Sequence, residues 1–79
     1  MRRVFADSLY WIAVSHPMDQ WHAAAMKAGQ QIRGAEIVTT QEVLSEFLTV
    51  FRGTPRLRAI AVRRVTQIHA NAVVLPQTD

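Results

Sequence analysis

Three short apolar runs, separated from one another by helix-like segments, limit the possible folds of this chain more than any other feature. The runs cover residues 3–6, 35–39 and 72–75, and each suits a strand that is covered on both faces. Between them the chain shows helical periodicity and helix-capping residues. Alternation of this kind gives a parallel sheet joined by right-handed crossovers. The sequence therefore predicts an α/β fold with three strands and about four helices.

The first interval between strands predicts two helices. A segment without Gly or Pro follows the first strand at about residues 8–14, and Asp7 or Ser8 is expected at its N-cap. Pro17 is expected at the first position of the next helix, which Gly34 ends. The apolar face of that helix has five residues at helical spacing, namely Met18, Trp21, Ala25, Ala28 and Ile32. We therefore expect Trp21, like Trp11, to pack in the core.

The second interval predicts two further helices. Residues 39–42 match a capping box, with Thr39 as the cap and Glu42 reaching back to it. The apolar face of the helix that follows consists of Val43, Leu44, Phe47, Leu48 and Phe51. Thr54 is expected to cap the last helix, with Pro55 at its first position. The apolar face of this last helix consists of Leu57, Ile60, Ala61, Val65 and Ile68.

The composition fits one small globular domain that spans residues 1–79. A hydrophobic fraction of 49% with 19% charged residues excludes a disordered chain. The absence of cysteine excludes disulfides and thiolate zinc sites, and it favours a reducing cytoplasm. No apolar run approaches the roughly 20 residues of a membrane span, and Asp7 and Ser8 interrupt the first apolar stretch too early for a signal peptide. We therefore expect a cytoplasmic protein without a membrane partner.

Two of the six acidic residues, Asp7 and Glu46, are candidates for a shared site. Asp7 follows the first strand, and Glu46 lies in the second turn of the helix after the second strand, beside its apolar stripe. If the strands are parallel, both lie at the carboxyl edge of the sheet, where open α/β sheets bind ligands. Carboxylates are the ligands that Mg²⁺ and Mn²⁺ prefer. From the pattern alone, however, a helix cap at Asp7 and a solvated Glu46 are the commoner interpretations.

Several segments, in matching order, resemble the N-terminal part of a PIN domain, and most of all the VapC-type toxins of bacterial toxin–antitoxin pairs. The first is Val4-Phe5-Ala6-Asp7-Ser8-Leu9. The second is Trp11-Ile12-Ala13 followed by Asp19-Gln20-Trp21-His22-Ala23-Ala24-Ala25, the third is residues 38–47, and residues 72–76 resemble the third strand. Together they cover essentially all 79 residues. The resemblance implies a three-layer α/β/α PIN-like fold with a parallel sheet, truncated to three strands and about four helices.

The resemblance also implies a function. Members of that family are Mg²⁺- or Mn²⁺-dependent endoribonucleases, which implies that Asp7 and Glu46 are catalytic metal ligands and that Ser8 helps to organise the site. It implies an RNA substrate, a cognate antitoxin that occludes the site, and a homodimer or other oligomer.

The family takes further acids from a later strand and helix, and Asp79 matches neither position. We therefore expect a single partial PIN-like domain whose first strand lies at an open edge of the sheet. Such a chain should be marginally stable, oligomeric or a fragment of a longer product.

Two alternatives remain open. One is a catalytically dead PIN remnant that only binds an antitoxin or another protein, which an RNase assay with Asp7→Asn as control distinguishes from a nuclease. The other is a small basic α/β nucleic-acid-binding module, since the net charge is +3 and the pI is about 10.7. Five arginines do not line up on one helical face, namely Arg52, Arg56, Arg58, Arg63 and Arg64. Metal-independent RNA binding that is lost when Arg63 and Arg64 are changed would support the second alternative.

Overall fold

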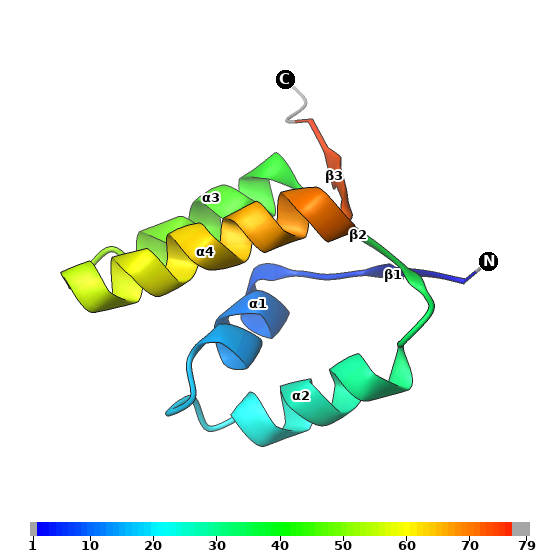
Figure 1. The fold of residues 1–79 in the computed structure, drawn as a ribbon, viewed down its shortest axis with the longest axis horizontal. Helices are drawn as coiled ribbons and strands as arrows, with labels where there is room; N and C mark the ends of the chain where they lie inside the picture. The colour runs from blue at the N-terminus through cyan, green and yellow to red at the C-terminus, as the bar shows by residue number, and fades with distance from the viewer. Residues whose placement is uncertain (1, 77–79) are drawn as a thin grey trace.

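A computed structural model describes residues 2–76, which form a mixed α/β fold (Figure 1). Three strands, β1 (Arg3–Phe5), β2 (Glu36–Thr40) and β3 (Val73–Leu75), pair in parallel in the order β1-β2-β3. Helices α1 (Ser8–Ser15) and α2 (His22–Gln31) connect β1 to β2, and α3 (Gln41–Val50) and α4 (Pro55–Asn71) connect β2 to β3. The predicted parallel sheet and four helices are confirmed, and each strand lies within one residue of its expected bounds.

The core is built around α3, which contacts α1, α4 and β2. The ring of Phe47 is completely buried, and its centroid lies 4.8 Å from that of Phe51, which is also buried. Five further buried apolar residues come from the two neighbouring helices, namely Trp11, Ala13, Val14, Ala61 and Ile68. In Figure 1, α3 and α4 lie side by side, with α1 next to them and α2 outermost. Burial of the apolar faces predicted for α3 and α4 thus supplies most of the hydrophobic stabilisation.

The start of α2 differs from the prediction. The helix begins at His22 and not at Pro17, because a turn of hydrogen bonds occupies the intervening residues. Oδ1 of Asp19 accepts a hydrogen bond from the backbone N–H of Trp21 at 2.8 Å, an Asx-turn that competes with helix formation. Met18 and Trp21 therefore lie outside the helix and are 85% and 64% exposed, so their expected place in the core was wrong.

Small residues and one polar tie hold α2 against α1. Ala25 is its one buried residue among those described, and a Cβ on Gly29 would lie only 2.9 Å from the hydroxyl of Tyr10 on α1. At the start of the helix, Nδ1 of His22 lies 2.6 Å from the carbonyl oxygen of Ala13. The contact with Ala13 gives His22 a structural role.

The helix caps after β2 and α3 test two sequence predictions. The capping box at Thr39 was wrong by one residue, because Thr40 is the N-cap of α3 and its hydroxyl accepts from the N–H of Val43 at 3.2 Å. Thr39 is instead completely buried within β2. By contrast, Thr54 caps α4 as predicted, accepting from the N–H of Leu57 at 3.1 Å, with Pro55 at the first position.

The sheet leaves β1 at one edge, as expected, because β2 separates it from β3. Both crossovers step across the sheet in the same direction, and right-handed connections of this kind place their helices on one face. None of the helices in residues 2–76 has the length and apolar character that crossing a membrane requires.

Candidate metal centre

Asp7 stands at the junction between β1 and α1. Its backbone is extended, with φ −93° and ψ 179°, and its Oδ1 accepts a hydrogen bond from the N–H of Tyr10 at 3.0 Å. Asp7 is therefore the N-cap of α1, and the structure selects it over Ser8 for that role. The side chain is exposed, and the cap engages only one of its two carboxylate oxygens. An aspartate in this position can hold the helix and still present an oxygen to a ligand.

Ser8 connects this junction to Glu46 on α3. The Ser8 side chain is buried, and its hydroxyl donates a hydrogen bond to Oε1 of Glu46. The Glu46 side chain is otherwise exposed. This bond places the Glu46 carboxylate beside the residue that follows Asp7, at the carboxyl end of β1. Both carboxylates also lie by the N-terminus of α1, where the helix dipole favours negative charge.

Thr39 fixes the backbone immediately before Asp7. Its buried hydroxyl donates to the carbonyl oxygen of Ala6 at 2.9 Å and accepts from Nε1 of Trp11 at 3.3 Å. The N–H of Ala6 in turn donates to the carbonyl of Val38 at 2.9 Å. These bonds tie β1, β2 and α1 together at the residue that precedes the site. Sequence reasoning missed this positioning role, since Thr39 was interpreted as a helix cap and Trp11 only as a core residue.

Asp7 and Glu46 both offer carboxylate oxygens, which hard divalent cations prefer as ligands. Within residues 2–76, no three or more His, Cys, Asp or Glu side chains form a group that could hold a metal. Mg²⁺ commonly binds through one or two carboxylates and retains several waters, which a pair of exposed carboxylates permits. Asp79, the acid that matched no family position, lies outside the described residues.

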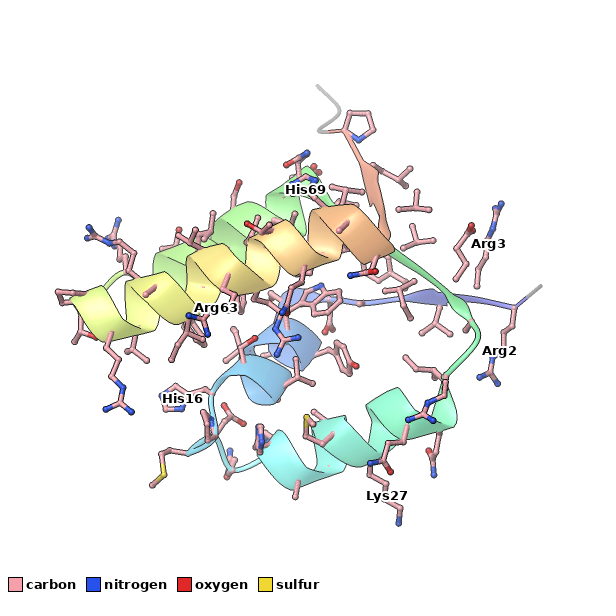
Figure 2. The ribbon with its side chains drawn as sticks, in the orientation of Figure 1. Arg2, Arg3, His16, Lys27, Arg63 and His69 are labelled. Atoms are coloured by element: carbon pink, nitrogen blue, oxygen red, sulfur yellow. The ribbon has the colours of Figure 1, made fainter. Side chains whose placement is uncertain are left out.

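The basic side chains do not gather around this pair. The labelled cations in Figure 2 come from residues 2–3, α2 and α4 and point in different directions. Arg3 pairs with Glu36 at 2.7 Å, and Nε of Arg64 donates to the buried hydroxyl of Ser15 at 3.0 Å, which ties α4 to α1. Arg64 thus has a structural contact with α1, whereas the side chain of Arg63 is exposed. These different directions agree with the sequence, in which the arginines do not line up on one helical face.

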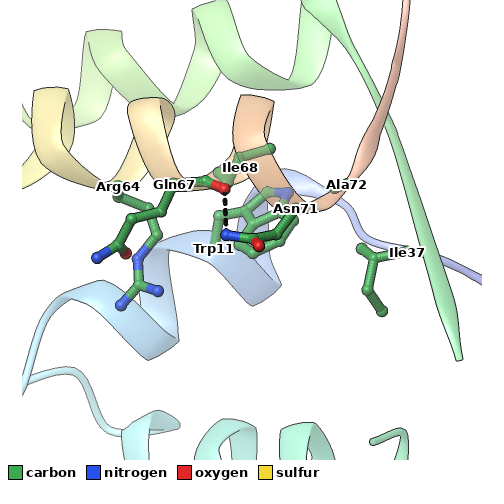
Figure 3. A pocket seen from close by; sticks show the side chains of 7 residues that line it. All are labelled: Trp11, Ile37, Arg64, Gln67, Ile68, Asn71 and Ala72. Atoms are coloured by element: carbon green, nitrogen blue, oxygen red, sulfur yellow. Dashed lines mark hydrogen bonds between the residues drawn. The ribbon is translucent and has the colours of Figure 1, made fainter. Parts of the chain in front are cut away.

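A separate cavity of about 250 Å³ lies between α1, β2 and α4 (Figure 3). Trp11, Ile37 and Ile68 line it with apolar surface, while Arg64, Gln67 and Asn71 add polar groups. The amide of Asn71 donates to the backbone carbonyl of Gln67 at 2.9 Å, so it is engaged at the end of α4. Neither carboxylate of the candidate site lines this cavity. It is therefore distinct from the candidate metal centre.

The parallel order β1-β2-β3, two helices in each crossover and an aspartate at the end of β1 together define a PIN-domain fold of the VapC type. Among solved structures, this chain is similar to VapC20 of Mycobacterium tuberculosis, a toxin that cleaves the sarcin–ricin loop, with a TM-score of 0.79. The two sequences are 20% identical, and the match covers 94% of this chain but 56% of the VapC20 chain. No protein-family model and no curated protein matches the sequence. The likeness establishes the PIN/VapC-like fold, which the sequence resemblance had predicted.

Proposed function

We propose that this chain is a partial PIN-like domain, over residues 1–79, of a metal-dependent endoribonuclease of the VapC toxin type. The observation that carries the proposal is the hydrogen bond from Ser8 to Glu46, which places one carboxylate beside the residue that follows Asp7 on this fold. The fold it shares with VapC20 supports the same reading.

In this proposal, Asp7 and Glu46 would hold Mg²⁺ or Mn²⁺ through their carboxylate oxygens. The cation would supply Lewis-acid activation of a water and stabilisation of phosphoryl charge in the hydrolysis of an RNA phosphodiester. Ser8 acts as a positioning residue, because its hydroxyl holds Glu46 in one rotamer. Tyr10 contributes through its backbone N–H, which fixes the Asp7 carboxylate. Thr39 keeps the carbonyl of Ala6, and so the direction of the chain entering Asp7, in place.

An RNase assay tests the metal-dependent activity. The substrates are an RNA hairpin with the sarcin–ricin loop sequence and a scrambled hairpin, each with Mg²⁺, with Mn²⁺ and with a chelator. We expect cleavage that needs the metal and that Asp7→Asn and Glu46→Gln abolish. Glu42→Gln is the matched control, because Glu42 is an exposed acid one turn earlier on α3. Metal-dependent cleavage that survives Asp7→Asn would refute the site.

Metal binding is tested independently of activity by titration with Mn²⁺, followed by water-proton relaxation. Two carboxylates should bind weakly, with a Kd on the order of 10⁻³ M, as for the weakest oxygen-ligand sites. Ser8→Ala should weaken binding by about 10–100-fold, the usual effect of removing a group that orients a ligand. Ser45→Ala, at an exposed serine of the same helix α3, should leave it unchanged. Equal binding by the Ser8 and Ser45 variants would remove Ser8 from the site.

We further propose an RNA substrate, a cognate antitoxin that occludes the two carboxylates, and a homodimer or other oligomer. The alternative is a catalytically dead remnant that binds an antitoxin or another protein. It is favoured because residues 2–76 contain no group of three or more His, Cys, Asp or Glu side chains that could hold a metal. Mn²⁺ binding at Asp7 without cleavage of either hairpin would select this alternative.

The third reading, a basic nucleic-acid-binding module, predicts RNA binding that needs no metal and is unaffected by Glu46→Gln. That binding should fall sharply with Arg63→Ala, whose side chain is exposed on α4. Since Arg64 bonds Ser15, a loss of binding with Arg64→Ala must be accompanied by a check of the fold.

A further inference from the structure

A second cavity adjoins the one shown in Figure 3. The cavity in Figure 3, which we call the sheet-side cavity, lies between α1, β2 and α4 and measures about 250 Å³. The second, which we call the α2 cavity, lies between α1, α2 and α4 and measures about 290 Å³. Trp11 and Arg64 line both cavities, so the two meet at these side chains. Two adjoining compartments of this size fall within the range of small-molecule sites, roughly 300–1,000 Å³.

The α2 cavity carries positive charge. Arg33, which follows the end of α2, and Arg64 on α4 both line it. Within residues 2–76, no Asp or Glu lines either cavity. Two guanidinium groups that share a hollow without a carboxylate repel each other, and an anion bound between them removes that repulsion. The α2 cavity therefore favours an anionic ligand group.

The guanidinium of Arg64 is held in place before any ligand binds. Its Nε donates to the hydroxyl of buried Ser15 at 3.0 Å, and the Arg64 side chain extends from α4 toward α1 in Figure 3. This bond uses the Nε–H and leaves the two terminal nitrogens as donors. A guanidinium presents such donors in a planar fork that matches phosphate oxygens. Because Arg64 is already ordered, binding a phosphate there costs less side-chain entropy.

The sheet-side cavity has a different character. Its walls are apolar at Trp11, Ile37 and Ile68, and amide side chains line it at Gln67 and Asn71. The Asn71 amide nitrogen donates to the backbone carbonyl of Gln67 at 2.9 Å, which leaves the Asn71 Oδ1 as an acceptor. Asn and Gln amides match the donor and acceptor pattern on the edge of adenine. Apolar walls with two such amides suit a flat heteroaromatic ring.

We propose that the two cavities together bind adenosine monophosphate (AMP), a nucleotide that carries a ring and an anion on one small molecule. The phosphate lies between Arg33 and Arg64, and the adenine lies in the sheet-side cavity beside the amide of Gln67. Neither Asp7 nor Glu46 lines either cavity, so this site is separate from the candidate metal centre. The proposal therefore stands or falls independently of RNA cleavage.

Nuclear magnetic resonance of the ¹⁵N-labelled 79-residue chain, without divalent metal, tests the binding. The two tryptophans give two indole N–H signals, and Trp21→Phe identifies the one from Trp11. We expect AMP to shift the Trp11 signal with a Kd on the order of 10⁻⁴ M, as for a ligand of modest efficiency in an open site. The Trp21 signal should not move, because Trp21 is 64% exposed and lines neither cavity. Adenosine and inorganic phosphate, which each lack one half of AMP, should bind at least about tenfold more weakly.

Two substitutions test the two halves of the site. Arg33→Gln should weaken AMP binding by about tenfold or more, because it removes a charge-assisted hydrogen bond to the phosphate. Arg63→Gln is the matched control, since Arg63 is an exposed arginine that lines neither cavity, and it should stay within about twofold of the parent. Gln67→Leu should abolish the preference for AMP over uridine monophosphate while phosphate binding persists. Circular dichroism of each variant checks the fold.

Several results would overturn the proposal. The Trp11 signal could fail to move at about 5 mM AMP, or inorganic phosphate or adenosine alone could bind as tightly as AMP. An equal loss of binding with Arg33→Gln and Arg63→Gln would remove the phosphate position, and an unchanged base preference in Gln67→Leu would remove the adenine position. Each of these results leaves the metal-dependent RNase assay untouched.

Discussion

Replacement of Thr39 by valine probes the hydrogen bonds that precede the candidate site. The Thr39 hydroxyl is completely buried, donates to the carbonyl of Ala6 and accepts from Nε1 of Trp11. Valine has nearly the same shape, so the change leaves no cavity. It leaves the indole N–H and the Ala6 carbonyl without this partner. The loss of stability therefore reports the two hydrogen bonds and not a packing defect.

The expected loss is about 2–4 kcal/mol, because each buried polar group left unsatisfied costs about 1–3 kcal/mol. At about 0.05–0.15 kcal/mol per residue, the 79 residues imply a total stability of about 4–12 kcal/mol. The substitution thus removes a large share of that total. With about 4–8 °C per kcal/mol for a chain of this size, we expect the Tm to fall by about 10–30 °C.

Urea and thermal unfolding followed by far-UV circular dichroism measure this loss, with tryptophan fluorescence as a second probe. Thr66→Val is the matched control, because the Thr66 hydroxyl makes only an exposed bond to the carbonyl of Val62 within α4. That change should stay within about 0.5 kcal/mol of the parent. If Thr39→Val unfolds at the same urea concentration as Thr66→Val, the proposed role of the Thr39 hydroxyl is refuted.

Three further substitutions test other parts of the fold. Phe47→Ala should cost about 3–5 kcal/mol, because the ring is completely buried, and a cooperative transition near the parent Tm would contradict the packing around α3. Thr54→Ala should lose about 1 kcal/mol in urea unfolding through the cap of α4, and Thr54→Ser should retain most of it. Gly34→Ala should lose about 1–2 kcal/mol through its φ of +88° alone, since an added Cβ meets no neighbour. An unchanged urea midpoint for Gly34→Ala would show that the backbone at residue 34 adjusts to a conformation that alanine adopts without strain.

The sheet and three of the helices were predictable because their signals are local. The apolar runs of β1, β2 and β3 lie between helices of sufficient length, which leaves a parallel sheet as the simple solution. Thr54 followed by Pro55 defines the start of α4 through side-chain chemistry alone. The apolar faces of α3 and α4 follow from their spacing. In these segments, propensity, capping and burial all indicate the same structure.

The start of α2 was not predictable from spacing, because a competing local hydrogen bond decided it. Pro17 suits the first turn of a helix, and Met18 and Trp21 continue the apolar spacing into Ala25. The carboxylate of Asp19 nevertheless bonds the N–H of Trp21, and the chain forms a turn there. The spacing of apolar residues does not show whether a turn held by this hydrogen bond is more stable than one additional turn of helix.

The candidate site also contains residues that the sequence could predict and one that it could not. Asp7 was recognisable from its position after an apolar strand, and the helical wheel placed Glu46 beside an apolar stripe. The role of Thr39 was hidden, because a threonine before a helix looks like a cap, and only the pairing of β1 with β2 shows which of two threonines faces inward. That choice between Thr39 and Thr40 depends on strand register, a long-range property.

The physical logic of the site is that one short segment performs three tasks. Residues 3–8 supply the edge strand, the cap of α1 and the serine that holds Glu46. The cap positions the Asp7 carboxylate, and the bond to Ser8 positions the Glu46 carboxylate, without the use of any long loop.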